Sequence, residues 1–242
     1  MNRALKLFLL AFAALVSARA DTIFNACLAP PGYINGIGNS SCGFTELTAT
    51  TDIGSVTLAL GVVLRYQGEV FPESANNYYV PGGNAPLPHS GAAWGFPFSI
   101  TTSGGNVVGD FTYLITITDT TQNTSVSFDP TTLPDNVYYT GGSETTQENL
   151  AVDTLLQNSE TLSFPFLAGP LNYSSTNLDT YVISLSATPV SGPAVDPTVS
   201  ENINITPEPA GEGLIGAGLI GLAMAARRRS RRASARRGAL VT

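Results

Sequence analysis

Short runs of alternating apolar and polar residues are the feature of this 242-residue chain that most restricts its fold. The clearest runs cover residues 55–65, 110–118 and 180–187; weaker ones cover 44–50, 96–102, 124–128, 160–166 and 198–205. Because side chains of a strand alternate between two faces, each run gives a strand one apolar face, and Gly, Pro, Asn and Asp punctuate the runs. We expect an all-β fold, an antiparallel β-sandwich of jelly-roll or Ig-like type.

The sandwich is predicted over residues 21–190. No convincing helix is expected between residues 21 and 206, although residues 150–156 are ambiguous. Residues 191–206 are predicted to form a linker, since Pro193 and Pro197 among Ser, Gly and Thr favour an extended chain.

Charge is divided unevenly along the sequence. Residues 21–206 hold sixteen acidic side chains and one basic side chain, Arg65, so this part carries a net charge near −15 and has no lysine. Such a surface repels nucleic acid and anionic lipid and attracts divalent cations. We therefore expect no nucleic-acid partner.

The N-terminus has the three parts of a secretory signal peptide, predicted as residues 1–20. Arg3 and Lys6 precede an uncharged apolar run, residues 7–16, and small residues follow at Ala18 and Ala20. Ala18 and Ala20 match the A-x-A site of signal peptidase, so the mature chain is predicted to begin at Asp21. Ten residues of helix reach only about 15 Å, which is too short for a stable membrane span.

The C-terminal residues 207–242 combine three features in a fixed order. The motif Pro207, Glu208, Pro209 comes first, and residues 210–226 form an apolar stretch long enough for a single transmembrane helix. An Arg-rich end, residues 227–242, follows and is predicted to stop transfer on the cytoplasmic side. Its stop-transfer arginines are Arg227, Arg228, Arg229, Arg231 and Arg232.

This tail resembles the PEP-CTERM sorting signal, and the resemblance is confined to it. The resemblance implies recognition and cleavage near the motif by an exosortase, a membrane cysteine protease. It also implies a Gram-negative bacterium that makes exopolysaccharide, where many such proteins are non-enzymatic matrix or surface proteins. The chain would occupy the inner membrane transiently and then the cell surface or the extracellular space.

Cys27 and Cys42 are the only cysteines. An even number in a chain expected to be exported predicts a disulfide, which would stabilise the fold by about 3 kcal/mol for a loop of this length. Zinc binding is disfavoured, because a structural zinc site takes four ligands and His89 is the only histidine.

Catalytic patterns are weak. His89 is accompanied by no Gly-x-Ser-x-Gly elbow, and the neighbouring segment suggests an exposed loop carrying Trp94, with loop packing favoured over a ligand-facing role for both residues. Sixteen acids make chance carboxylate pairs expected, so they indicate no glycosidase. No catalytic residue, and no enzyme, is predicted.

Two binding hypotheses stay open. Asp119, Asp129 and Asp135 fall in neighbouring predicted loops and offer oxygen ligands for calcium, although turn capping is the favoured interpretation and no cofactor is otherwise expected. Tyrosine pairs at 78–79 and 138–139, in expected loops, offer rings for sugar stacking, with one of each pair facing the core. The leading hypothesis is a structural protein of the cell surface or exopolysaccharide (biofilm) matrix. The alternatives are a carbohydrate- or calcium-binding sandwich and, less favoured, a secreted hydrolase.

Overall fold

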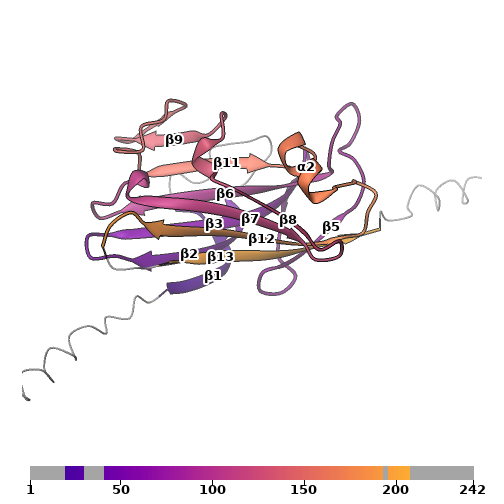
Figure 1. Cartoon of the computed structure of the whole chain (residues 1–242), viewed down its shortest axis with the longest axis horizontal. Coiled ribbons are helices and arrows are strands. Elements are labelled where there is room, and N and C mark those ends of the chain that lie inside the picture. Colours follow the sequence, from indigo (N-terminus) through magenta and orange to yellow (C-terminus); the bar gives the residue numbers. More distant parts are fainter. Residues whose placement is uncertain (1–19, 30–40, 193–195, 208–242) are drawn as a thin grey trace, which may run out of the picture. The chain divides into compact units, whose positions relative to one another are not determined.

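The computed structural model describes residues 20–29, 41–192 and 196–207. The chain separates into two compact units, Met1–Thr206 and Pro207–Thr242. All strands and helices reported below belong to the first unit. The strands form two sheets (Figure 1). The strands confirm the expected all-β class.

The larger sheet has eight described strands, and every neighbouring pair in it is antiparallel. Seven of them follow the order β1-β2-β3-β6-β11-β9-β10, and β4 pairs with β3. Their bounds are β1 Ala20–Cys27, β2 Cys42–Thr50, β3 Ser55–Leu64, β4 Gly68–Val70, β6 Trp94–Ser103, β9 Val137–Thr140, β10 Ser143–Thr145 and β11 Leu155–Glu160.

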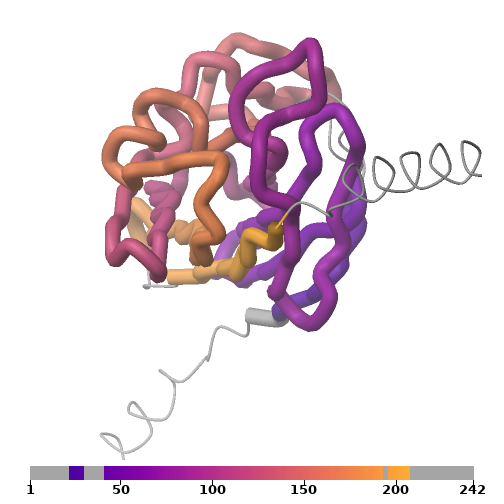
Figure 2. Tube along the Cα trace, turned by 90° about the vertical axis from the view of Figure 1, so that its right-hand side faces the viewer, coloured from indigo at the N-terminus to yellow at the C-terminus, as the bar shows by residue number. Residues whose placement is uncertain are grey.

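The smaller sheet has five described strands in the order β5-β13-β12-β7-β8. All pairs are antiparallel except β13 with β5, which is parallel. Figure 2 shows the yellow C-terminal strand reaching the purple part of the chain that contains β5. The bounds are β5 Asn77–Pro81, β7 Phe111–Asp119, β8 Thr124–Phe128, β12 Thr180–Pro189 and β13 Thr198–Thr206.

The hydrophobic core is formed by the alternate, inward-facing residues of both sheets. Strand β3 contributes Val56, Leu58, Leu60 and Val62, the face expected from the sequence, and β6 contributes its two phenylalanines and Ile100. The other sheet supplies one residue in two from β7, β12 and β13, as in Ile115, Ile183 and Ile203. Burial of these aliphatic and aromatic side chains is the main stabilising contribution of the fold.

The predicted linker over residues 191–206 is corrected by strand β13. From Thr198 onward the chain is a central strand, hydrogen-bonded to β12 on one side and β5 on the other. Its alternate residues Val199, Glu201, Ile203 and Ile205 are buried. The weaker alternating run at residues 198–205 is thereby confirmed as a strand, and the linker interpretation of the same residues was wrong. The acidic Glu201 at one of the four inward positions is what weakened the strand signal.

The strand expected at residues 160–166 is wrong except for Glu160, the last residue of β11: a turn follows, and then a short helix, α2 (Pro165–Leu171). Pro165 at the first helical position fits a helix start, since its fixed φ is helical and its missing N–H would be unsatisfied there anyway. Asn172 ends the helix in the left-handed conformation, with φ of 51°. The expectation of no convincing helix was therefore wrong here, and two 3₁₀ turns, η1 (Val108–Asp110) and η2 (Pro130–Thr132), add to it.

Five of the described strands had no expectation in the sequence. These are β1, β4, β5, β9 and β10, and the ambiguous residues 150–156 turn out to include the start of β11. No helix among the described residues has the length and hydropathy of a membrane span. The predicted helix over residues 210–226 lies outside the described part, as do residues 1–19 of the predicted signal peptide.

Candidate functional site

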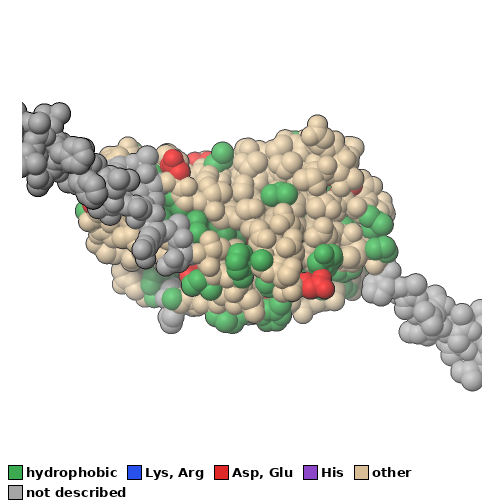
Figure 3. Space-filling model, turned by 90° about the horizontal axis from the view of Figure 1, so that it is seen from below, with side chains coloured by type: hydrophobic (Ala, Val, Ile, Leu, Met, Phe, Trp, Pro, Cys, Tyr) green, Lys and Arg blue, Asp and Glu red, His purple; other side chains and the backbone are tan. Residues whose placement is uncertain are grey.

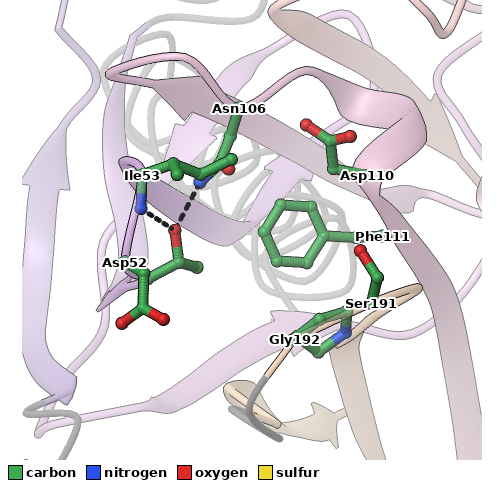
Figure 4. A pocket seen from close by; sticks show the side chains of 9 residues that line it. Asp52, Ile53, Asn106, Asp110, Phe111, Ser191 and Gly192 are labelled. Carbon is green, nitrogen blue, oxygen red and sulfur yellow. Dashed lines mark hydrogen bonds between the residues drawn. The ribbon is translucent and has the colours of Figure 1, made fainter.

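A pocket of about 230 Å³ opens where three connections from distant parts of the sequence meet. They are the β2–β3 turn, the segment between β6 and β7, and the residues that follow β12 (Figure 4). The lining residues are Thr51, Asp52, Ile53, Asn106, Asp110, Phe111, Pro189, Ser191 and Gly192. We call this the end pocket.

The walls of the end pocket are tied together by the hydroxyl of Thr51. Thr51 Oγ1 accepts hydrogen bonds from Asn106 Nδ2 at 2.9 Å, from the Gly54 backbone N–H at 3.1 Å and from that of Ile53 at 3.4 Å. A Cβ on Gly54 would lie 1.9 Å from the carbonyl oxygen of Ser103, so only glycine permits this close approach. The β2–β3 turn is thereby fixed against the end of β6.

The opposite wall contains Asp110 and Phe111. Asp110 Oδ2 accepts a hydrogen bond from the Val107 N–H at 2.8 Å, which fixes the carboxylate at the start of β7. In Figure 4 the Phe111 ring lies between Asp52 on one side and Ser191 on the other. None of the lining side chains is basic. The pocket therefore offers hydrogen-bond acceptors, hydroxyl groups and a small apolar patch from Phe111, which is 5% exposed, in a negative field.

A second polar cluster, buried at the β7–β8 turn, contains Asp119 and Asp179. Both side chains are buried, and their carboxyl groups face each other. Asp119 Oδ1 accepts from the N–H groups of Thr121 and Gln122, each at 2.9 Å, whereas its Oδ2 has no hydrogen-bond partner among the residues that the structure describes. Burial, and then the neighbouring Asp179 charge, raise the pKa of Asp119 above its ordinary value, although the two N–H groups oppose this.

Two glutamates are also buried in this domain. Glu201 of β13 is 0% exposed, and burial raises its pKa to about 8. Glu160, at the end of β11, is 3% exposed; burial and the charge of Asp135 raise its pKa to about 8. Both side chains are therefore mostly protonated at neutral pH.

The predicted disulfide is confirmed. Cys27 and Cys42 are bonded, and they lie directly opposite each other in the antiparallel pair of β1 and β2. The bridge fixes β1, an edge strand, to the rest of the sheet. Ala26 beside it packs with Phe44 and Ala59 in a small cluster separate from the main core.

Trp94 is not in an exposed loop, as had been expected. It begins β6, is 1% exposed and packs near Tyr181, with ring centroids 5.9 Å apart. His89 is exposed, and its ring stacks on Tyr66 with centroids 3.5 Å apart. Arg65 donates from Nη1 to the carbonyl oxygens of Ser90 and Ala92, so its guanidinium group holds the loop before β6 in place.

The three aspartates considered for calcium do not converge. Asp119 caps the β7–β8 turn, and Asp129 accepts from the N–H and hydroxyl of Thr131 at the start of η2. Asp135 accepts from Asn158 Nδ2 instead. No group of three or more His, Cys, Asp or Glu residues able to hold a metal occurs among the described residues.

The two tyrosine pairs lie in strands rather than loops, but the expected division of each pair is found. Tyr78 and Tyr138 are buried, whereas Tyr79 is 50% exposed and Tyr139 is half-buried. Of the predicted sorting motif, Pro207 is exposed and follows β13 directly; of the predicted signal-cleavage residues, Ala20 is the first residue of β1. Ala18, Glu208, Pro209 and the five stop-transfer arginines lie outside the described residues.

The end pocket was not found by sequence reasoning. Its residues come from three segments separated by more than 130 positions between first and last, and none of them forms a local motif. The only local signal was the Thr-Asp-Ile-Gly turn at residues 51–54, which resembles any other turn.

Fold and site together define a class: an acidic, disulfide-bonded, all-β domain of two sheets with a polar pocket at one end. No family model, curated protein or solved structure matches this chain.

Proposed function

We propose that this protein is an exported, non-enzymatic structural protein of the cell surface or exopolysaccharide matrix, sorted through its C-terminal tail. The observation that carries the proposal is where the folded domain begins and ends. Strand β1 starts at Ala20 and β13 stops at Thr206, so the described domain fills the interval between the two terminal segments that resemble processing signals. Removal of both segments would leave every described strand intact apart from Ala20.

The disulfide supports an oxidising destination. Disulfides form and persist in the periplasm and outside the cell, whereas they are rare in the reducing cytosol. We propose signal peptidase and an exosortase as processing partners, with the membrane as a transient location.

The surface supports a structural role in a hydrated polymer. Outward hydroxyl groups pair across neighbouring strands, as in Thr116 with Ser127 at 2.9 Å and Thr48 with Thr57 at 2.9 Å. Figure 3 shows a face that is mostly uncharged and polar, with scattered hydrophobic and acidic side chains and no basic one. Such a surface stays soluble and presents many neutral hydrogen-bonding groups.

We also propose that the two sheets pack face to face. The packed sheets are interpreted as a β-sandwich, and jelly-roll or Ig-like topology stays a prediction.

The sorting proposal is tested by expressing the full chain in an exosortase-producing Gram-negative host. We expect the wild-type protein at the surface or in the medium, with a mass that lacks residues 1–20 and the tail. The triple variant Pro207→Ala, Glu208→Ala, Pro209→Ala should stay in the inner membrane with its tail intact. An exosortase-deficient host is the matched control. Equal location and mass for wild type and variant would refute the proposal.

A further inference from the structure

We propose that the end pocket binds one ring of a neutral saccharide. This goes beyond the structural role, and it does not depend on the route of export, because it rests on the chemistry of the lining alone.

The charge of the residues that line the end pocket restricts the class of ligand that it can bind. Asp52 and Asp110 bring two carboxylates to the end pocket, and no lining side chain is basic. An anionic ligand, such as a uronate or a phosphate, would be repelled. A neutral ligand that donates hydrogen bonds is favoured, because ionised carboxylates only accept them. Sugar hydroxyl groups are such donors.

Phe111 restricts the class of ligand further. In Figure 4 it lies between Asp52 and Ser191, with the Asn106 amide and the Asp110 carboxylate on one side of it. Phe111 is 5% exposed and belongs to the hydrophobic core, so it adds a small apolar patch to the pocket wall. A small apolar patch flanked by polar groups suits a ligand that has an apolar C–H face and a hydroxyl-bearing rim, as a pyranose has. The volume of about 230 Å³ is below the usual range for drug-sized ligands, which fits one sugar ring rather than a longer segment.

The walls are also pre-formed. The hydrogen bonds to Thr51 Oγ1, the close contact at Gly54 and the bond from the Val107 N–H to Asp110 hold the lining before any ligand arrives. A pre-formed pocket loses little conformational entropy on binding. For a ligand of one ring we expect a Kd of about 1 mM, set by its few atoms.

The test is ligand-observed NMR on the full chain with D-glucose, D-galactose and N-acetylglucosamine, and with D-glucuronate and calcium chloride alone as comparison probes. We expect at least one neutral sugar to bind, and glucuronate to bind at least about tenfold more weakly. Asp52→Ala removes a charged acceptor and should weaken binding about tenfold. Phe111→Leu keeps an apolar side chain, loses the ring and should weaken binding severalfold.

Glu73→Gln is the matched control, since Glu73 is exposed and does not line the end pocket. It should bind as the wild type does. Circular dichroism and melting temperature of each variant separate a lost contact from a lost fold. The proposal is overturned if no neutral sugar binds at about 50 mM, far above the expected Kd. It is also overturned if glucuronate binds equally well, if calcium alone binds, or if folded Asp52→Ala and Phe111→Leu proteins bind unchanged.

Failure of this test leaves the sorting experiment unaffected. Conversely, an intact tail in the sorting experiment says nothing about the end pocket. The two proposals are therefore distinguishable.

Discussion

The carboxyl group of Glu201 lies against the phenol of Tyr78 in the buried interior, where β13 and β5 run in parallel. Tyr78 donates its hydroxyl proton to the carbonyl oxygen of Gly43 at 2.9 Å. Among the described residues, neither carboxyl oxygen of Glu201 has a partner at hydrogen-bond distance, and burial raises its pKa although the neighbouring Tyr78 and Thr45 oppose the shift. A buried carboxylate in this position is costly, so the protonated form is favoured.

The first prediction concerns how the free energy of unfolding depends on pH. Glu201 has a pKa of about 8 in the folded protein, against about 4.3 for an unfolded glutamate. Between these two pH values it is protonated in the native state and ionised in the unfolded chain. Its stabilising contribution is complete below pH of about 4.3 and is lost as pH rises to about 8, at about 1.4 kcal/mol per pH unit. Glu160 adds a loss in the same window. Urea unfolding at pH 5, 6.5 and 8, values chosen to span about that window, should show decreasing stability.

Glu201→Gln removes this titration and is neutral at every pH. The variant should show a shallower decline than the wild type and exceed its stability near pH of about 8. Glu73→Gln, at an exposed position, should follow the wild-type curve. Identical slopes for Glu201→Gln and wild type would contradict the assignment.

The second prediction concerns the orphan oxygen of Asp119. In Asp119→Asn, Oδ1 still accepts the two turn N–H groups, and the amide nitrogen can donate toward Asp179. We expect a gain of about 1 kcal/mol in the free energy of unfolding at neutral pH. Asp119→Ala loses the turn cap and should instead be destabilised by about 1 kcal/mol. Denaturant unfolding of both variants decides the matter, and a destabilised asparagine variant would count against the prediction.

The third prediction concerns the disulfide. Replacing Cys27 and Cys42 with serine should cost about 3 kcal/mol, because the bridge restricts the unfolded chain. Wild-type protein unfolded in the presence of a reductant should show the same loss. If the serine variant matched the oxidised wild type in stability, the bridge would have no stabilising role.

The fourth prediction uses Trp94, the only tryptophan in the sequence. Because it is 1% exposed, its fluorescence should resist quenching by iodide in the native state and shift to longer wavelength on unfolding. Trp94→Ala should cost about 3–5 kcal/mol, as large core truncations do. Tyr79→Ala, at a half-exposed site, should cost much less. Strong native-state quenching would place Trp94 at the surface instead.

Strong local alternation allowed much of the fold to be predicted. In β3, β7 and β12 every second residue is apolar, and those residues form the core. Strand β13 gave only a weak alternating run at residues 198–205, because Glu201 interrupts an otherwise apolar series, and the same residues were therefore also assigned to a linker. The burial that favours a neutral Glu201 is not visible in the sequence. Strand β5 is too short to give a periodic signal, since only Tyr78 and Val80 face inward.

The candidate site was harder to predict for a different reason. The end pocket depends on which turns meet in space, and Thr51, Asn106 and Ser191 carry no pattern that links them. The disulfide was predictable, because two cysteines in a chain expected to be exported leave one pairing.

The parallel pairing of β5 with β13 has a consequence for how the protein is made. Asn204 and Thr206 hydrogen-bond to Tyr78 and Val80 across 126 positions of sequence. Among the described strands β5 has only this neighbour, so during synthesis its backbone groups lack a sheet partner until almost the whole domain has left the ribosome. Closing so long a loop is slow, and a nascent chain therefore carries an open edge that a chaperone or a truncation would encounter first.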